Sequence, residues 1–176
     1  PKYNLIYNAF EWEIPRYIHC PPVMKDEHNK LSKRNGDASF QDLVAKGYLP
    51  GAILNYIALL GWSPEEDKEI FTLDELVQAF NVKHIGKVGA IFDPDKLKWI
   101  NGMWLRGMDL DSYYDLVKPY IDQAVKGDFD GKKIAAILQQ RAETLVEIPG
   151  MLDFFDEFPA YDNALYVNKK MKTTLE

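Results

Sequence analysis

The chain has 176 residues, of which 47% are hydrophobic and 27% charged, as in an ordinary folded protein with a sizeable core. No apolar run is long enough to span a bilayer, and the first residues lack the basic and apolar segments of a secretory signal. The net charge of −6 argues against a generic nucleic-acid coat, although a local basic patch can still bind RNA. The single cysteine, Cys20, cannot form an internal disulfide, which suits a cytoplasmic protein.

The first part of the chain predicts little regular structure. Residues 3–10 favour a short helix. Residues 17–24 are apolar but contain two adjacent prolines, so we expect an edge strand or an extended segment at best. Residues 25–38 are polar and contain Asn and Gly, which predicts an exposed loop.

Helical signals begin at Ser39, which is expected to cap a helix over residues 40–46 that ends at Gly47. Residues 50–60 predict the most apolar helix, because Ile53, Leu54, Ile57 and Leu60 follow at helical spacing. We expect this helix at the centre of the core.

A capping box, Thr72 to Glu75, predicts the start of another helix. Its expected buried stripe consists of Leu73, Leu76, Val77 and Phe80.

The later helices are predicted by acidic caps. A helix starts at Asp93-Pro94, the next starts at Asp109 or Asp111, and another starts at Asp130. Pro119 is expected to kink or split the helix in which it lies. Short helices should follow Pro149, so the fold class is mainly α, with a boundary near residues 106–110.

One segment carries chemistry: Lys30-Leu31-Ser32-Lys33-Arg34, followed by Asn35-Gly36-Asp37. Three cations in five residues, with a small hydroxyl among them, can follow a polyphosphate, and the helix start near Ser39 also favours anions. The alternative is a solvated basic turn, which is the commoner origin of such a cluster. Composition alone leaves both open.

The segment resembles the KMSKS signature of class I aminoacyl-tRNA synthetases, in the form typical of bacterial glutamyl-tRNA synthetases. The flanking text is similar to that family in order, although the likeness thins after about residue 126. The matching stretches are Tyr7-Asn8-Ala9-Phe10, Trp12-Glu13-Ile14-Pro15, His19-Cys20-Pro21-Pro22-Val23-Met24, Gly47-Tyr48-Leu49-Pro50-Gly51-Ala52, Asn55-Tyr56, Leu60-Gly61-Trp62-Ser63, Glu69-Ile70-Phe71-Thr72 and residues 92–102.

The resemblance implies that the loop closes over ATP while glutamate attacks the α-phosphate, and that glutamate then passes to the 3′ end of its tRNA. Lys33 would be the main catalytic and ATP-contacting residue, and Lys30 a second catalytic one. Arg34 and Ser32 would also contact ATP, which would carry Mg²⁺ in the full-length enzyme. Leu31 stands where the family usually has Met, and Arg34 replaces the final Ser of the generic signature.

The partner signature of the family, HIGH, has no counterpart upstream of Lys30. His84-Ile85-Gly86-Lys87 is similar in letters but lies downstream of the loop, so we interpret it as an interhelix connection. We therefore expect an internal fragment without the nucleotide-binding half, in which glutamate would be bound by the missing part. Such a fragment should not aminoacylate by itself.

The resemblance also implies three regions. Residues 1–24 would be the tail end of the catalytic nucleotide-binding fold, and residues 25–108 the KMSKS loop with an α-helical stem-contact domain. Residues 109–176 would be a truncated first subdomain of a helical anticodon-binding domain.

Candidate tRNA contacts are Lys83, Lys87, Lys98 and Arg106, although exposed helices carry lysines for solubility in any case. Further candidates are Lys96, Lys132, Lys133, Lys169, Lys170 and Lys172. Trp99 could stack on a base, whereas we expect Trp104 in the core.

No metal site is expected, because Cys20, His19 and His28 lack ligand spacing. The resemblance implies ATP, glutamate and a glutamate-accepting tRNA as partners, no membrane, and a cytoplasmic monomer. The alternatives are a non-catalytic helical RNA-binding module and a helical protein-interaction scaffold. The sequence does not identify the source organism or show whether the glutamine tRNA is also charged.

Overall fold

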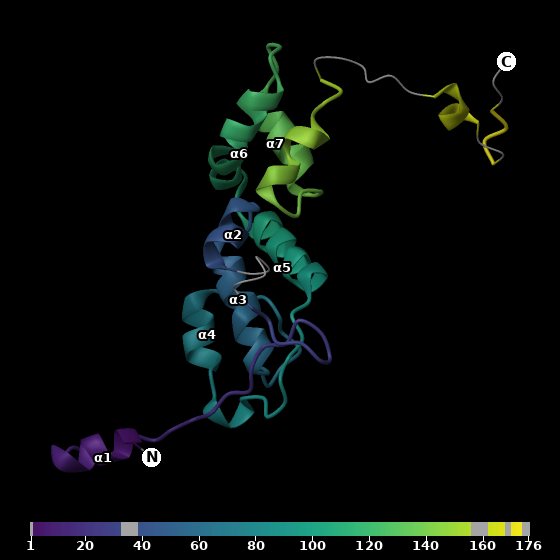
Figure 1. Ribbon diagram of the computed structural model, residues 1–176. Coiled ribbons are helices and arrows are strands. Elements are labelled where there is room, and N and C mark those ends of the chain that lie inside the picture. Colours follow the sequence, from purple (N-terminus) through teal and green to yellow (C-terminus); the bar gives the residue numbers. More distant parts are fainter. Residues whose placement is uncertain (1, 33–38, 156–161, 168–169, 174–176) are drawn as a thin grey trace.

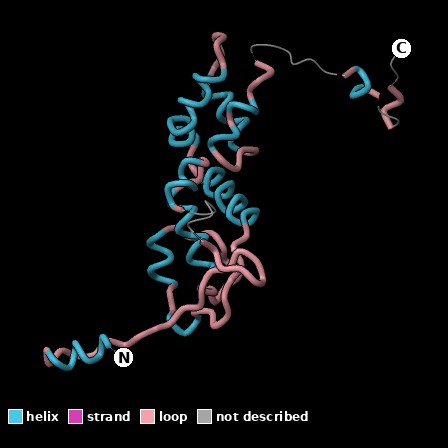
Figure 2. The backbone as a smooth tube through the Cα atoms, in the orientation of Figure 1, coloured by secondary structure: helices cyan, strands magenta, loops and turns pink. Residues whose placement is uncertain are grey.

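The computed structural model describes residues 2–32, 39–155, 162–167 and 170–173. These residues form helices joined by loops, with isolated bridges and no strand among them, so the mainly α fold is confirmed (Figure 2). The α-helices are α1 (Lys2–Ala9), α2 (Phe40–Ala45), α3 (Pro50–Gly61), α4 (Leu73–Ala79), α5 (Pro94–Gly107), α6 (Leu110–Ala124) and α7 (Gly131–Gln139). Short 3₁₀ turns are η2 (Val82–His84), η3 (Leu145–Glu147), η4 (Pro149–Met151) and η5 (Asn163–Tyr166).

The body of the molecule is elongated (Figure 1). Helices α6 and α7 lie at one end, α3 and α4 extend toward the other, and α2 and α5 lie between them. Helix α1 lies away from the body, and none of its residues is buried. Residues 17–24 form an extended segment, as predicted, that leads from α1 into the body.

The starts of α2, α4, α5, α6 and α7 follow the predicted caps, because a short polar side chain satisfies backbone donors at each of these five. Helix α3 begins after Leu49 without a side-chain cap. Ser39 Oγ accepts from the Asp42 N–H at 3.2 Å, and Thr72 with Glu75 forms the predicted capping box. Asp109, rather than Asp111, caps α6, and Asp93 and Asp130 cap α5 and α7.

Pro119 does not split its helix, because α6 runs from Leu110 to Ala124 as one element. Tyr113, Val117 and Ile121 bury one face of α6 beside α7. This packing holds the helix together although proline removes one backbone donor.

Two larger hydrophobic cores lie along the body, and Trp62, Phe71 and Leu76 form a smaller third cluster. The first core consists of Leu43, Ala52, Ile53, Tyr56, Leu97 and Ile100. The second core consists of Leu105, Tyr113, Val117, Ile121, Val125, Ile134, Ala135, Leu138, Ala142, Leu145, Ile148 and Leu152. Helix α5 contributes to both, so one continuous helix links the two cores.

Two predicted apolar stripes are buried only in part. In α3, Ile53 is buried as predicted, but Leu54 and Ile57 are 42% and 53% exposed, and Asn55 and Tyr56 share the buried face with Ile53. The predicted position of α3 at the centre of the core therefore holds for one of its faces only. In α4 only Leu76 is buried, whereas Leu73, Val77 and Phe80 are exposed.

Candidate functional site

The signature segment begins inside the described residues and continues outside them. Lys30 is exposed, and Leu31 and Ser32 are half-buried. Lys33 and Arg34 lie outside the described residues, so their assignment to ATP stays a prediction.

A tight turn holds the start of this segment. Both carboxylate oxygens of Asp26 accept from the Asn29 side-chain amide, at 3.0 and 2.9 Å, and one also accepts from the backbone N–H groups of His28 and Asn29. The Asn29 amide, followed by these backbone donors, lowers the pKa of Asp26 below its ordinary value. Asn29 O in turn accepts from the Lys25 N–H at 2.8 Å, and the Leu31 N–H donates to Val23 O at 3.0 Å. The turn thus fixes the backbone on both sides of Lys30, from Val23 to Leu31.

The base of the turn is fixed to the segment that precedes α5. The Met24 N–H donates to Ala90 O at 2.9 Å, and the Phe92 N–H donates to Met24 O at 2.8 Å. Gly89 permits this approach, because a Cβ there would lie 2.7 Å from Pro22 O. The loop is therefore attached to the helical body by backbone hydrogen bonds.

The attachment continues into the first core through Tyr56. Its hydroxyl accepts from the Asp93 N–H at 2.6 Å, and its ring meets Phe92 edge-on at 5.4 Å. Burial raises the pKa of Tyr56 to about 12, so the hydroxyl stays protonated. The signature segment, α3 and the start of α5 thus form one connected unit.

The predicted tRNA contacts fall into two groups. Lys83 in η2 and Lys87 in the following connection are exposed, and no ion pair is found for either among the described residues. The connection that carries them is the predicted interhelix link, and the Gly86 N–H binds Gly61 O at 2.9 Å.

Lys98 and Arg106 lie on α5 and are engaged within the protein. Lys98 Nζ lies 3.2 Å from Glu147 and 3.4 Å from Glu143, and hydrogen bonding to Glu147, chiefly, raises the pKa of Lys98. The guanidinium of Arg106 covers Gly102, where a Cβ would lie 3.0 Å from it. Trp104 is half-buried against the first core, in keeping with the prediction, whereas Trp99 is 38% exposed.

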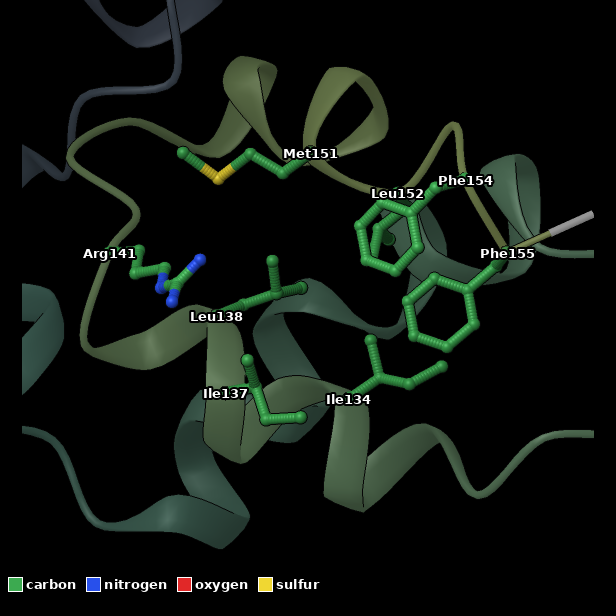
Figure 3. Close-up of a pocket in the computed structure, with 8 residues that line it drawn as sticks. All are labelled: Ile134, Ile137, Leu138, Arg141, Met151, Leu152, Phe154 and Phe155. Carbon is green, nitrogen blue, oxygen red and sulfur yellow. The ribbon is translucent and has the colours of Figure 1, made fainter. Parts of the chain in front are cut away.

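Two pockets among the described residues are unsuited to a triphosphate. An apolar pocket of about 320 Å³ lies between α7 and the turns after it, with Arg141 as its charged member (Figure 3). A second, of about 410 Å³ beside α4, is lined by Glu65, Glu66 and Glu75, which would repel phosphate. A third, of about 280 Å³, is lined by Glu66, Asp67 and Glu69 beside Lys68 and Lys96. The signature loop stays the candidate phosphate site because of its own cations.

The described residues show no group of three or more His, Cys, Asp or Glu side chains that could hold a metal ion. In the same residues, no helix has both the length and the apolar character needed to cross a membrane.

Sequence reasoning missed two sets of residues. One is the Asp26–Asn29 turn, whose polar Asp-x-x-Asn spacing is a usable local signal. The other is a set of polar contacts between the two cores, centred on Asn101, which is fully buried. In the sequence, the sign of that set was a polar residue, Asn101, within the apolar pattern of the helix predicted from Asp93.

Comparisons with known proteins agree with this geometry. Residues 1–99 match the model of the tRNA synthetases class I (E and Q), catalytic domain, and residues 112–176 match an anticodon binding domain. Glutamate–tRNA ligases of Clostridium kluyveri and Clostridium botulinum strain Hall are 58% and 56% identical over the whole chain. The chain spans 36% of the length of each relative.

Solved structures show the same likeness. The glutamate tRNA ligase of Elizabethkingia meningosepticum, in complex with its amino acid, has a TM-score of 0.79 at 26% identity, covering 97% of this chain and 39% of that one. The glutamate-tRNA synthetase of Elizabethkingia anophelis has a TM-score of 0.73 at 30% identity, covering 87% and 35%. Since the catalytic-domain model alone matches more than half of the chain, this chain belongs to the E and Q family of class I tRNA synthetases.

Proposed function

We propose that this chain is part of a glutamate–tRNA ligase, in which it supplies the ATP-phosphate loop and helices that contact tRNA. The anchored start of the signature loop is the observation that carries the proposal, because backbone hydrogen bonds hold Met24 and Leu31, the residues on either side of the turn that contains Lys30. The relatives at 56–58% identity support glutamate as the amino acid.

The proposed chemistry is the attack of glutamate on the α-phosphate of ATP, with loss of pyrophosphate and formation of glutamyl-adenylate. Negative charge grows on the leaving pyrophosphate, and Lys33, with Lys30, Ser32 and Arg34 around it, would stabilise that charge. Loss of one such electrostatic contact commonly costs about 100- to 1,000-fold in rate. Mg²⁺ would arrive with ATP, and we assign no protein ligand to it.

The tRNA side of the proposal rests on exposed cations. Lys83 and Lys87 are available for phosphate contacts, whereas Lys98 is held by two carboxylates and suits a structural role better. Because the chain spans 36% of its relatives, we propose that glutamate binding and the rest of the nucleotide site belong to other parts of a longer protein. The 176-residue chain should then be inactive alone, and we propose that the parent is a cytoplasmic monomer.

The test is Lys33→Ala in the full-length enzyme, with Lys46→Ala as a control because Lys46 is an exposed lysine at the end of α2. Lys33→Ala should slow ATP–pyrophosphate exchange, measured with tRNA present, by at least about 100-fold. Its tRNA affinity should stay near that of the parent, and Lys46→Ala should change neither property.

Normal exchange in the Lys33→Ala variant would refute the assigned role. Binding of tRNA should weaken steeply as salt rises, because phosphate contacts release counterions. A protein-interaction scaffold would show no such tRNA binding.

A further inference from the structure

Asn101 joins the two cores. Its side chain is fully buried in α5, where Oδ1 accepts from the Leu49 N–H at 2.7 Å and Nδ2 donates to Glu143 O at 2.6 Å. Leu49 precedes α3 at the first core, whereas Glu143 lies in the loop after α7 at the second core. One amide therefore bridges two segments that are far apart in the sequence.

A second bridge lies beside it. The Leu145 N–H donates to Gly47 O at 3.1 Å, and a Cβ on Gly47 would lie 2.7 Å from the backbone nitrogens of Leu145 and Val146. The backbone between α2 and α3, in the unit of the first core, thus directly contacts the backbone after α7, in the unit of the second core.

The C-terminal end of α5 is held in the same way. Gln139, the last residue of α7, donates from Nε2 to Leu105 O at 3.1 Å and to Met108 O at 2.8 Å. Gln139 is 7% exposed, so these bonds form away from water. They satisfy two carbonyls that a helix end otherwise leaves free.

Lys98 closes the junction at its surface through its ion pairs with Glu143 and Glu147. Glu147 also accepts from the Thr144 N–H at 2.7 Å and from Thr144 Oγ1 at 2.9 Å, which fixes the carboxylate that faces Lys98. The junction therefore combines buried amide bonds with a partly buried ion-pair cluster.

We infer that Asn101 and Lys98 are positioning residues, which fix the unit bearing the signature loop against the unit of α6 and α7. This inference rests on the proposed function, since its consequence is that a tRNA held along both units presents its 3′ end at the loop. Buried polar groups fix geometry well because each alternative arrangement leaves a donor or acceptor without a partner. The apolar pocket beside Arg141, in contrast, has nothing in the structure to say what covers it.

The test is Asn101→Asp in the full-length enzyme, which keeps the shape of the side chain but turns its Glu143-facing donor into an acceptor. Asn55→Asp is the matched control, because Asn55 is equally buried but binds Glu69 O, Phe71 N–H and the Trp104 indole within the first unit. Lys98→Gln is a milder variant that should fold in any case. Its control is Lys68→Gln, whose partner Glu75 belongs to the same unit.

Two properties are measured. The first is the distance distribution between spin labels at Val77 and Asp115, exposed positions on α4 and α6, with the native cysteines replaced. The second is the kinetics of aminoacylation. Asn101→Asp should broaden the distribution and lower kcat/KM for tRNA by ~10- to 100-fold, since a displacement of about 1 Å can cost on the order of 100-fold. The KM for ATP should not change, and Lys98→Gln should show the same pattern more weakly.

The variant Glu147→Gln distinguishes two roles of Lys98, namely holding the junction and binding tRNA directly. It removes the closer of the two carboxylates that hold Lys98 and leaves Glu143 in place. The tRNA affinity would therefore rise if Lys98 bound phosphate, whereas weakening of the junction lowers kcat/KM for tRNA as Lys98→Gln does.

The inference is overturned if Asn101→Asp leaves the distance distribution or the tRNA kinetics unchanged, or if Asn55→Asp broadens the distribution equally. A parent protein without aminoacylation activity would overturn the proposed function instead, and the label distances would still report on the junction.

Discussion

Replacing Gly47 by alanine tests the close contact between the two units. Gly47 has a φ of +83°, a left-handed conformation that costs a residue with a Cβ about 1–2 kcal/mol. The new Cβ would also lie 2.7 Å from two backbone nitrogens, so the segment of Leu145 and Val146 has to move. Displacing the Leu145 N–H from Gly47 O costs about 1 kcal/mol more.

The expected loss for Gly47→Ala is therefore about 2–3 kcal/mol in the free energy of unfolding, or roughly 5–10 °C in Tm for a chain of this size. Urea and thermal unfolding followed by circular dichroism measure both quantities. The matched control is Gly61→Ala, because Gly61 ends α3 and a Cβ added there would meet no atom within 4 Å. Gly61→Ala should be neutral or stabilise by up to about 1 kcal/mol.

Unfolding of Gly47→Ala at the same urea concentration as the parent chain would refute this account of the contact. An equal loss of stability in Gly61→Ala would refute it too, since the loss would then reflect any added methyl group.

Two further predictions concern single side chains. The hydroxyl of Tyr113 is buried without a hydrogen-bond partner among the described residues, so Tyr113→Phe should raise the free energy of unfolding by about 1 kcal/mol. A clear loss in urea unfolding would show that the hydroxyl has a partner. Hydrogen bonds from Lys68, chiefly, and from the Thr72 N–H lower the pKa of Glu75 from 4.5 to about 2. Its contribution is therefore present above pH 4.5 and lost as the pH falls toward 2, so Glu75→Gln should flatten the fall of Tm across that range. An unchanged slope would contradict this origin.

Local features of the fold could be predicted from the sequence because their causes are local. A cap at Ser39 or Asp93 depends on donors two or three residues away, and the structure confirms both. The position of Gly47 at the end of α2 was predicted for the same reason, whereas its contact with Leu145 depends on segments 98 residues apart and has no local sign.

The buried faces of the helices were harder to predict, because the spacing of apolar residues gives no information on which amide side chains are buried. Asn55 occupies the buried face of α3 since three partners satisfy it, and Leu54 beside it points outward. The same holds for Asn101 in α5. The chemistry of the loop was predicted by resemblance, but its anchor at Met24 required the packing of residues 89–92.

Helix α5 has 14 residues, and its ends belong to different cores. Each residue added to or removed from an α-helix turns everything beyond it by about 100° and shifts it by about 1.5 Å. A single insertion between Ile100 and Leu105 would therefore rotate the second core by about 100° relative to the first and separate the groups that join them. Length changes in this lineage should accumulate in the loops at residues 63–71 and 126–129, while the count of residues in α5 stays constant.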